Sequence, residues 1–482
     1  MSDVAKVFNT DRRIRLGVWG LGRGLHLLGP CAALNIDVVA GLDYNAYMRE
    51  QFVERCPNAL TTDDLRTFLE ADIDAVLLAS FLPNHADDAI ACLRAGKHVL
   101  SEVTAFMTPA EGVRLTEEVE RSGLIYQMAE NYPFSAENRW LARRWEEGLF
   151  GDLMYGEYEY VHEVLTLAYT DINGVPLEPG GRAHPWRSWM SFHYYNTHSL
   201  GPIMAITGLR PVEAAALPGA VRLPGFLVRS GDGMGGISPS LVRMSNGGLV
   251  RNLMGATTND SHIQRLWGTK GAAEQVDGAL RVRLGGFGSA PKHRIDPPLD
   301  DLGRMAAEAG HGGGDFWTIY YFAREILTGH KGPFDVYTTA DCTLQGIQAY
   351  RSQTLGGIPQ PIPDFRRPDD RDAFRHDTFR QTPYDVENGL FDGPAEGPVA
   401  AGFNTVVRDL IAATNAVAAA EAWSSIAEDV ADPAFLAGIE TDAVAARPRL
   451  DAAQQAAWQI IEAFPGSDAA RVLVEVMDRT AS

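Results

Sequence analysis

Three glycines follow a short apolar run near the start of the chain. The run RLGVWG covers residues 15–20, and Gly20, Gly22 and Gly24 alternate with larger residues at its end. Such a turn leaves bare backbone beside the N-terminus of the next helix, an arrangement that binds the pyrophosphate of a dinucleotide. Leu25 stands where the usual fingerprint has its third glycine, and we expect Gly24 to relieve the crowding between helix and strand instead.

A carboxylate follows this turn at the distance that a dinucleotide site requires. Asp43 ends a second apolar run, IDVVAGLD, at residues 36–43. Its oxygens can accept hydrogen bonds from ribose hydroxyls and would repel a 2′-phosphate, so the pattern predicts a site for NAD in preference to NADP. The alternative interpretation is a plain turn in which Asp43 caps a helix.

Two candidate bases lie in the segment YYNTHSLGP, residues 194–202. Tyr195 and His198 are three residues apart, so both could reach one pocket from an irregular segment or from one face of a helix. Imidazole and phenol groups act as general bases when their pKa values are adjusted. The alternative is a helix that Thr197 caps, with His198 in the core.

Several further polar residues are placed to contact a ligand. Glu130 and Asn131 follow an apolar run, and the carboxyl ends of parallel strands face the ligand crevice. Tyr160 and His162 share one face of a predicted strand, although His162 could equally lie on an open sheet surface. We expect Glu130, Tyr160 and His162 to contact the substrate, and Asn131 the cofactor.

Arg187 and His311 complete the set of candidate residues. Arg187 lies between Trp186 and Trp189, where its fork could bind hydroxyls or an anion, and an interface role is the alternative. His311 lies in the glycine-rich segment GHGGGDFW, residues 310–317, which could move as a lid over substrate or cofactor.

The elements that must position these residues fall into two patterns. Apolar runs without alternation, typical of strands buried in a parallel sheet, recur at residues 15–20, 36–43, 74–80, 97–102 and 124–130. Helices are predicted between them at 85–94 and, after the capping box of Thr108 and Glu111, from 109 to about 122. This alternation predicts a Rossmann domain with a doubly wound parallel sheet over residues 1–131.

The pattern of apolar and polar residues changes after residue 132. An amphipathic helix is followed by longer segments that alternate apolar and polar residues, so we expect an α/β domain with a mostly antiparallel sheet over residues 132–360. Helices are predicted near 315–328 and 338–350. Residues 361–482 read as an extended wrap or linker, followed by an alanine-rich helical extension.

Composition excludes several classes of partner. The 482 residues carry a net charge of −20, which disfavours nucleic acids and anionic membranes, and no apolar run reaches the length of a membrane span. The N-terminus lacks the apolar stretch of a signal peptide, so we expect a cytoplasmic protein. The four cysteines, Cys31, Cys56, Cys92 and Cys342, show no zinc spacing, and we expect free thiols and no metal.

The stretch SFLPNHADDAIACLRAGKHVLSEVT, residues 80–104, resembles the Gfo/Idh/MocA family of nicotinamide-dependent proteins. Pro83 to His85 and Gly96 to Val99 match the family pattern, as does Glu102, but Val103 and Thr104 replace its Lys-Pro. The family's dehydrogenases use that lysine beside the reacting hydroxyl, and they have an Asp where this chain has Tyr194.

These departures point to one branch of the family. The motifs QMAENYPF, YEYVHE, HPWRSW, YNTHSLGPI, WGTKGA and GHGGGDFW together resemble glycoside hydrolase family 109. That resemblance implies glycoside cleavage by transient oxidation of a ring hydroxyl, elimination, addition of water and re-reduction, with NAD regenerated in each turnover. It suggests an N-acetylgalactosaminide or another, possibly anionic, glycoside as substrate. An oxidoreductase with net hydride transfer and a sugar or NAD sensor are the alternatives.

The resemblance also implies roles for the candidate residues. Tyr195, His198 and His311 would be catalytic, and a small carbohydrate the only partner besides further copies of the chain in a homo-oligomer. The expected cofactor contacts come from the glycine turn and the strand ends around it: Gly20, Gly22, Arg23, Gly24, Asp43, Ser80, Asn84, His85, Glu102 and Asn131.

Overall fold

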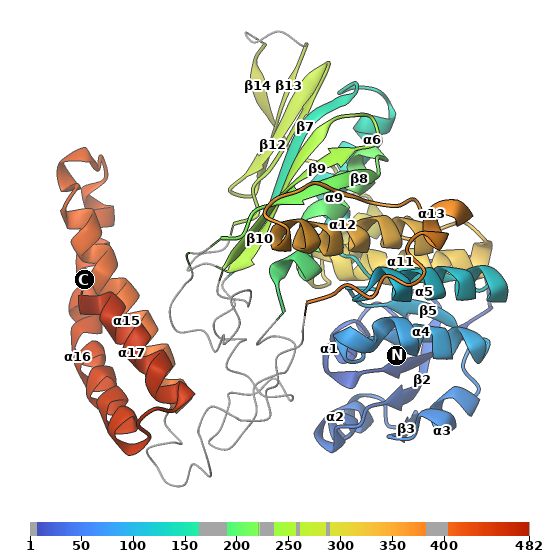
Figure 1. The fold of residues 1–482 in the computed structure, drawn as a ribbon, viewed down its shortest axis with the longest axis horizontal. Coiled ribbons are helices and arrows are strands. Elements are labelled where there is room, and N and C mark those ends of the chain that lie inside the picture. Colours follow the sequence, from blue (N-terminus) through green and yellow to red (C-terminus); the bar gives the residue numbers. More distant parts are fainter. Residues whose placement is uncertain are drawn as a thin grey trace.

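Two β-sheets flanked by helices dominate the computed structural model (Figure 1). It describes residues 7–162, 190–219, 221, 236–256, 261–285, 290–381 and 403–481. Among the described residues, no helix combines the length and the apolar character needed to cross a bilayer.

The first sheet has six parallel strands in the order β3-β2-β1-β4-β5-β6. This confirms the predicted Rossmann fold, and all five predicted strands are present. The strands are β1 (Ile14–Trp19), β2 (Ile36–Leu42), β3 (Leu60–Thr62), β4 (Ala75–Leu78), β5 (His98–Ser101) and β6 (Tyr126–Met128). Only the short β3, whose residues are not buried, was missed by the search for apolar runs.

Helices connect these strands as the crossovers of a parallel sheet require. They are α1 (Leu21–His26), α2 (Ala46–Arg55), α3 (Leu65–Glu70), the turn η1 (Leu82–Asn84), α4 (His85–Arg94) and α5 (Pro109–Ser122). The predicted capping box is confirmed, because the Thr108 hydroxyl accepts from the Glu111 N–H and the Glu111 carboxylate accepts from the Thr108 N–H. Gly123 ends α5 with a left-handed φ of 65°.

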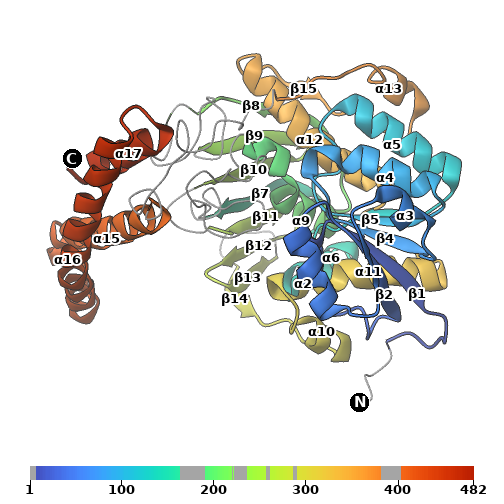
Figure 2. The ribbon, with the colours of Figure 1, turned by 90° about the horizontal axis from the view of Figure 1, so that it is seen from below.

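The second sheet has nine strands in the order β14-β13-β12-β11-β7-β10-β9-β8-β15, which follow one another across Figure 2. Within the described strands of this second sheet only β7 and β10 pair in parallel, which confirms a mostly antiparallel sheet. The strands are β7 (Leu153–His162), β8 (Pro211–Ala216), β9 (Ile237–Met244), β10 (Leu249–Ala256), β11 (Gln264–Gly268), β12 (Gly271–Val276), β13 (Ala279–Leu284), β14 (Lys292–Ile295) and β15 (Gln360–Pro361).

Helices of the second half pack against this sheet and against the first one. They are η2 (Tyr132–Phe134), α6 (Ala136–Glu146), η3 (Phe192–Tyr195), α9 (Thr197–Thr207), α10 (Asp301–Ala306), η4 (His311–Gly313), α11 (Gly314–Thr328), α12 (Val336–Thr354) and α13 (Pro368–Asp372). The predicted helices at 315–328 and 338–350 correspond to α11 and α12.

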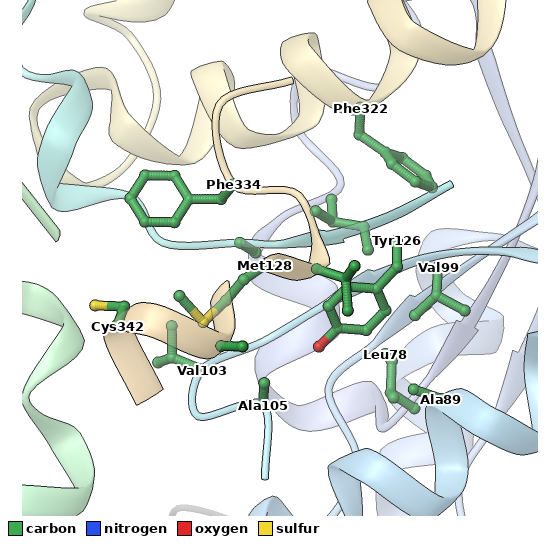
Figure 3. Packing of buried hydrophobic residues seen from close by; sticks show 14 of the residues in the cluster. Leu78, Ala89, Val99, Val103, Ala105, Tyr126, Met128, Phe322, Phe334 and Cys342 are labelled. Carbon is green, nitrogen blue, oxygen red and sulfur yellow. The ribbon is translucent and has the colours of Figure 1, made fainter. Parts of the chain in front are cut away.

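One hydrophobic core runs through both sheets. Phe334, which precedes α12, packs beside Met128 of β6, and the Met128 N–H donates to the Phe334 carbonyl at 3.0 Å (Figure 3). Helix α11 returns to the first domain, where Tyr320 stacks on Phe8 and Arg12 donates to the carbonyl of Ile326. The two domains therefore share their packing.

The segment from 361 to 381 ties the two domains together on another side. The Gln381 N–H donates to the Tyr194 hydroxyl at 2.8 Å, and its side-chain oxygen accepts from the Ser191 N–H. The Ala110 N–H at the start of α5 donates to the Asp377 carbonyl. This part of the predicted wrap thus contacts both domains.

The C-terminal residues form a helical unit, which confirms the predicted extension. It consists of α15 (Phe403–Ser424), η5 (Ala427–Asp429), α16 (Pro433–Ala463) and α17 (Asp468–Ala481), drawn in red in Figure 1. Leu410, Ile460 and Leu473 belong to a core of its own.

We expect Gly24→Ala to destabilise the first domain. A Cβ at position 24 would lie 2.6 Å from Cγ1 of Val18, which is fully buried in β1 and cannot move aside. Crowding of this kind costs about 1–3 kcal/mol of unfolding free energy. Calorimetry should show a lowered unfolding midpoint, whereas the control Gly29→Ala, with no atom within 4 Å of its Cβ, should not. Equal midpoints would contradict this account.

Candidate functional site

The glycine turn has the shape of a dinucleotide cradle. Gly20 has a φ of 90°, and a Cβ there would lie 2.0 Å from the carbonyl oxygen of Ala79. A Cβ on Gly22 would meet nothing nearer than Cε of Met48 at 4.0 Å, so the backbone above this position is open. The Leu21 N–H donates to Asp43, but the N–H groups of Gly22 and Arg23 that follow it have no partner within the helix, which leaves them available to phosphate oxygens. The turn therefore fits a bound dinucleotide.

Gly24 takes the structural role that Leu25 cannot. Its Cα packs directly against Val18 of β1, while Leu25 lies half-buried at the edge of the core. The chain thus keeps close packing between helix and strand with a glycine one residue earlier than the usual pattern.

Asp43 holds the glycine turn through two backbone N–H groups. Oδ2 accepts from the Leu21 N–H at 2.7 Å, and Oδ1 accepts from the Asn45 N–H at 2.8 Å. A carboxylate has about four lone-pair sites, so it can still accept ribose hydroxyls. Burial, together with the charges of Asp88 and Asp43, raises the pKa of the nearby Tyr44 hydroxyl. A 2′-phosphate would meet these same negative charges.

The residues after β4 brace the strand ends. Nδ1 of His85 lies 2.8 Å from the Thr104 carbonyl oxygen, and Nε2 lies 3.1 Å from that of Ser80. Burial lowers the pKa of this imidazole. The Ser80 hydroxyl donates to Asp88 at 2.6 Å, whereas Asn84 is exposed. His85 therefore lies between the carbonyls of the two loops, and the one N–H of its neutral ring donates to one of them.

Arg23 connects the cradle to the second domain. Its Nε donates to Oε1 of Glu102 at 2.8 Å, and its Nη2 donates to Oδ1 of Asp315 at 2.9 Å. Asp315 also accepts from Nδ2 of Asn131 at 2.8 Å and lies 2.9 Å from Nδ1 of His311. Although burial opposes it, hydrogen bonds from His311 and Arg23 hold the pKa of the Asp315 carboxyl well below its usual range.

A buried carboxylate and imidazole form the centre of the adjoining pocket. Glu130 follows β6 and is fully buried, and Nδ1 of His198 on α9 lies 2.8 Å and 3.0 Å from its two oxygens. The Tyr132 N–H also donates to this carboxylate. An ionised carboxylate only accepts hydrogen bonds, so it holds the proton of His198 on Nδ1 and leaves Nε2 as the basic nitrogen.

Tyrosine rings surround this histidine. The centroids of Tyr132, Tyr160 and Tyr195 lie 4.6 Å, 4.9 Å and 4.8 Å from that of His198. Burial, with smaller effects of neighbouring tyrosines, raises the pKa of the Tyr132 and Tyr160 hydroxyls. These two phenols therefore stay protonated at neutral pH and can serve as hydrogen-bond donors.

Three more histidines border the same cluster. His162 lies beside Tyr160, with 5.6 Å between ring centroids, and His311 lies 6.2 Å from Tyr132. Sequence reasoning missed His262, which lies 5.4 Å from Tyr160, because no motif surrounds it. It also missed Tyr132, although this residue directly follows Glu130 and Asn131. No group of His, Cys, Asp or Glu among the described residues could hold a metal ion.

The two positions that depart from the dehydrogenase pattern lie in the core. The Tyr194 side chain is buried against the 361–381 segment, and its backbone carbonyl accepts from the Thr104 hydroxyl at 2.8 Å. Val103 is buried near Met128 in Figure 3. Thr197 does not cap α9, because Asn196 is the N-cap residue and the Thr197 hydroxyl is buried without a partner. Arg187 lies outside the described residues.

Comparison with known proteins places this geometry in context. The profile of an oxidoreductase family with an NAD-binding Rossmann fold, Gfo/Idh/MocA, matches residues 14–130. A glycosyl hydrolase family 109 protein of Shewanella putrefaciens is 25% identical over 399 residues, which are 73% of this chain and 85% of that protein. An alpha-N-acetylgalactosaminidase of Shewanella oneidensis is 26% identical over the same shares of both chains.

Solved structures agree on the fold. A levoglucosan dehydrogenase in complex with NADH and levoglucosan aligns with a TM-score of 0.58 at 17% identity, covering 73% of this chain and all of that one. The similarity extends beyond the Rossmann domain into the second sheet and shows the architecture common to both proteins.

We expect the stability of the cradle to depend on Asp88. Burial and the neighbouring Asp87 raise the pKa of the Asp88 carboxyl to about 6, against the hydrogen bond from Ser80. The folded state therefore binds this proton more tightly than the unfolded chain, and ionisation penalises folding above pH 6 but not below the unfolded pKa near 4. Asp88→Asn should raise the unfolding free energy by about 1–2 kcal/mol at pH 7.5 after allowance for partial exposure.

Thermal unfolding at pH 7.5 and pH 4.5 tests this expectation. The gain of Asp88→Asn should shrink to about one-third at the lower pH, which lies only slightly above the unfolded pKa. Asp87→Asn is the matched control, because Asp87 is exposed and pairs with Arg114. Equal responses of the two variants at both pH values would show that burial of Asp88 is not the cause.

Proposed function

We propose that this chain, whose residues 14–130 belong to the NAD-binding Rossmann fold of the Gfo/Idh/MocA family, is an NAD-dependent glycosidase. The match of residues 14–130 to an NAD-binding oxidoreductase family and the similarity to glycosyl hydrolase family 109 proteins support an NAD-dependent enzyme. The glycosidase activity is the further step, and the observation that carries it is the buried pair of Glu130 and His198 beside three tyrosines.

His198 is the base in this proposal. Glu130 fixes the proton on Nδ1, so Nε2 can take a proton from a sugar hydroxyl or from the carbon next to a ring ketone. The carboxylate also stabilises the imidazolium that results, as a buried acid does for a catalytic histidine. Glu130 thereby acts through His198, and the expectation that it contacts the substrate is replaced by this positioning role.

The tyrosines complement the base. Tyr160 and Tyr132, kept protonated by burial, can donate to an oxygen that gains negative charge as the proton leaves. Tyr195 contacts His198 edge to face and can orient the leaving oxygen. When bound, NAD would accept a hydride from the ring and return it at the end of turnover.

Two features favour elimination and hydrolysis over simple oxidation. Val103 stands where the family's dehydrogenases have a lysine beside the reacting hydroxyl, and Tyr194 stands in place of an Asp and points into the core. The name of the Shewanella oneidensis relative supports an N-acetylgalactosaminide as substrate. Net oxidation of a sugar is the second candidate, because the Glu130–His198 pair could also deprotonate a hydroxyl in a dehydrogenase.

A single assay separates the two candidates. The protein is incubated with NAD⁺ and a panel of aryl glycosides that includes N-acetylgalactosaminides, and released phenol and NADH absorbance are followed separately. We expect many equivalents of phenol per protein with no net NADH, because the hydride returns in each turnover. NADH formed in proportion to product would instead establish the dehydrogenase.

Substitutions at the buried pair test its role. Glu130→Gln and His198→Gln should each lower kcat/KM by about 10²–10⁴, the usual contribution of a positioned base, while NAD affinity stays unchanged. His193→Gln is the control, because His193 is also buried in the preceding turn but faces Gln353. Variants of the pair that keep wild-type kcat/KM would remove His198 from the mechanism.

A further inference from the structure

One carboxylate lies between the cofactor cradle and the substrate pocket. Asp315 is more than nine-tenths buried. Each of its two carboxylate oxygens has two polar partners within hydrogen-bond distance. Oδ1 accepts from Arg23 and Asn131, and Oδ2 lies 2.9 Å from His311 and 3.4 Å from Nη1 of Arg23. Arg23 and Asp315 are 292 residues apart in the sequence, so tertiary packing alone brings these groups together.

On the cradle side, one positive charge faces two negative ones. Arg23 neutralises two carboxylates, those of Glu102 and Asp315, and it lies in the first turn of α1. Phosphate oxygens that enter this turn add negative charge directly beside the guanidinium. The position of Arg23 is therefore sensitive to an occupied cradle, and Asp315 is the group that feels any change on the pocket side.

The loop on the pocket side is shaped around the same carboxylate. His311, Gly312 and Gly313 have left-handed φ values of 54°, 62° and 94°. A Cβ at Gly310 would lie 2.6 Å from Oδ2 of Asp315, so the chain passes close to the carboxylate there. The N–H groups of Gly313 and Asp315 both donate to the Gly310 carbonyl, at 3.2 Å and 3.4 Å. The loop depends on Asp315 for its conformation.

We propose that Asp315 is a positioning residue that couples occupancy of the cofactor cradle to the order of the His311 loop, with Arg23 as the group on the cofactor side. Phosphate in the cradle orders Arg23, Arg23 holds Asp315, and Asp315 holds His311 against the pocket. This coupling concerns the two sites and not the reaction, so it stands whether the protein is a glycosidase or a dehydrogenase.

ADP-ribose is a suitable probe, because it carries the pyrophosphate but no nicotinamide ring that could touch the pocket. Amide hydrogen exchange of the full-length protein is measured by mass spectrometry with and without saturating ADP-ribose. In the wild type we expect peptides covering residues 310–314 to exchange at least about fivefold more slowly with ADP-ribose, the lower end of typical coupling between sites. Peptides covering residues 20–26 report binding itself.

Two variants remove the proposed connection. Because Arg23→Met is expected to weaken binding, ADP-ribose is raised in each variant until residues 20–26 reach full protection. Under these conditions the protection of residues 310–314 should fall to less than half of the wild-type effect in Asp315→Asn and in Arg23→Met. The double variant should resemble either single variant, because both break one path. Glu325→Gln is the control, since Glu325 lies on the same helix α11 but binds Gln127 and the Gly332 N–H.

Protection of the loop in the two variants decides whether the coupling exists. Loss of loop protection in both variants, with retained protection of the cradle and of the Glu325→Gln control, supports the coupling. Undiminished loop protection in Asp315→Asn, or no effect of ADP-ribose on the wild-type loop, overturns it. Asp315→Asn is also monitored by thermal unfolding, and Arg23→Met, whose side chain is one-third exposed, provides the test if Asp315→Asn fails to fold.

Discussion

A charged carboxylate that is removed from water must have partners, and Glu130 is fully enclosed at the end of β6. His198 and the Tyr132 N–H supply them. This requirement draws α9 of the second domain onto the carboxyl edge of the first sheet, where the Rossmann fold also exposes its cofactor cradle. The need to pair this single charge thereby brings His198 and its tyrosine neighbours to this edge of the first sheet.

The same logic repeats around Asp315. Here Arg23 comes from the cradle, Asn131 from the loop after β6, and His311 from a glycine-rich turn. The two buried carboxylates, Glu130 and Asp315, thus have different partners. Glu130 pairs with His198, while Asp315 joins Arg23 of the glycine turn to His311, and Glu130 and Asn131 are adjacent in the chain. A short segment after β6 therefore contributes to both networks.

Local patterns in the sequence carried much of the fold. Uninterrupted apolar runs predicted five of the six parallel strands, and the Thr108–Glu111 capping box predicted the start of α5, because both signals act within a few residues. The same reasoning anticipated that Gly24 would replace the missing glycine at Leu25. β3 was missed because its LTT segment is short and not buried.

The site was harder to foresee for a physical reason. The pairs Glu130–His198 and Arg23–Asp315 join residues 68 and 292 positions apart, and no local pattern encodes such contacts. Residue types and strand ends indicated which side chains gather at this edge of the sheet, but not that Glu130 would face a histidine or that His85 would lie between two backbone carbonyls. His262 entered the cluster only through the pairing of its strand region with β7.

The core shared by the two domains also bears on how ligands come and go. A hinge motion that separated the two sheets would expose Met128, Phe334 and Phe322 to water. Each Å² of apolar surface exposed in this way costs about 25 cal/mol of free energy. The shared core therefore opposes a hinge opening between the two sheets.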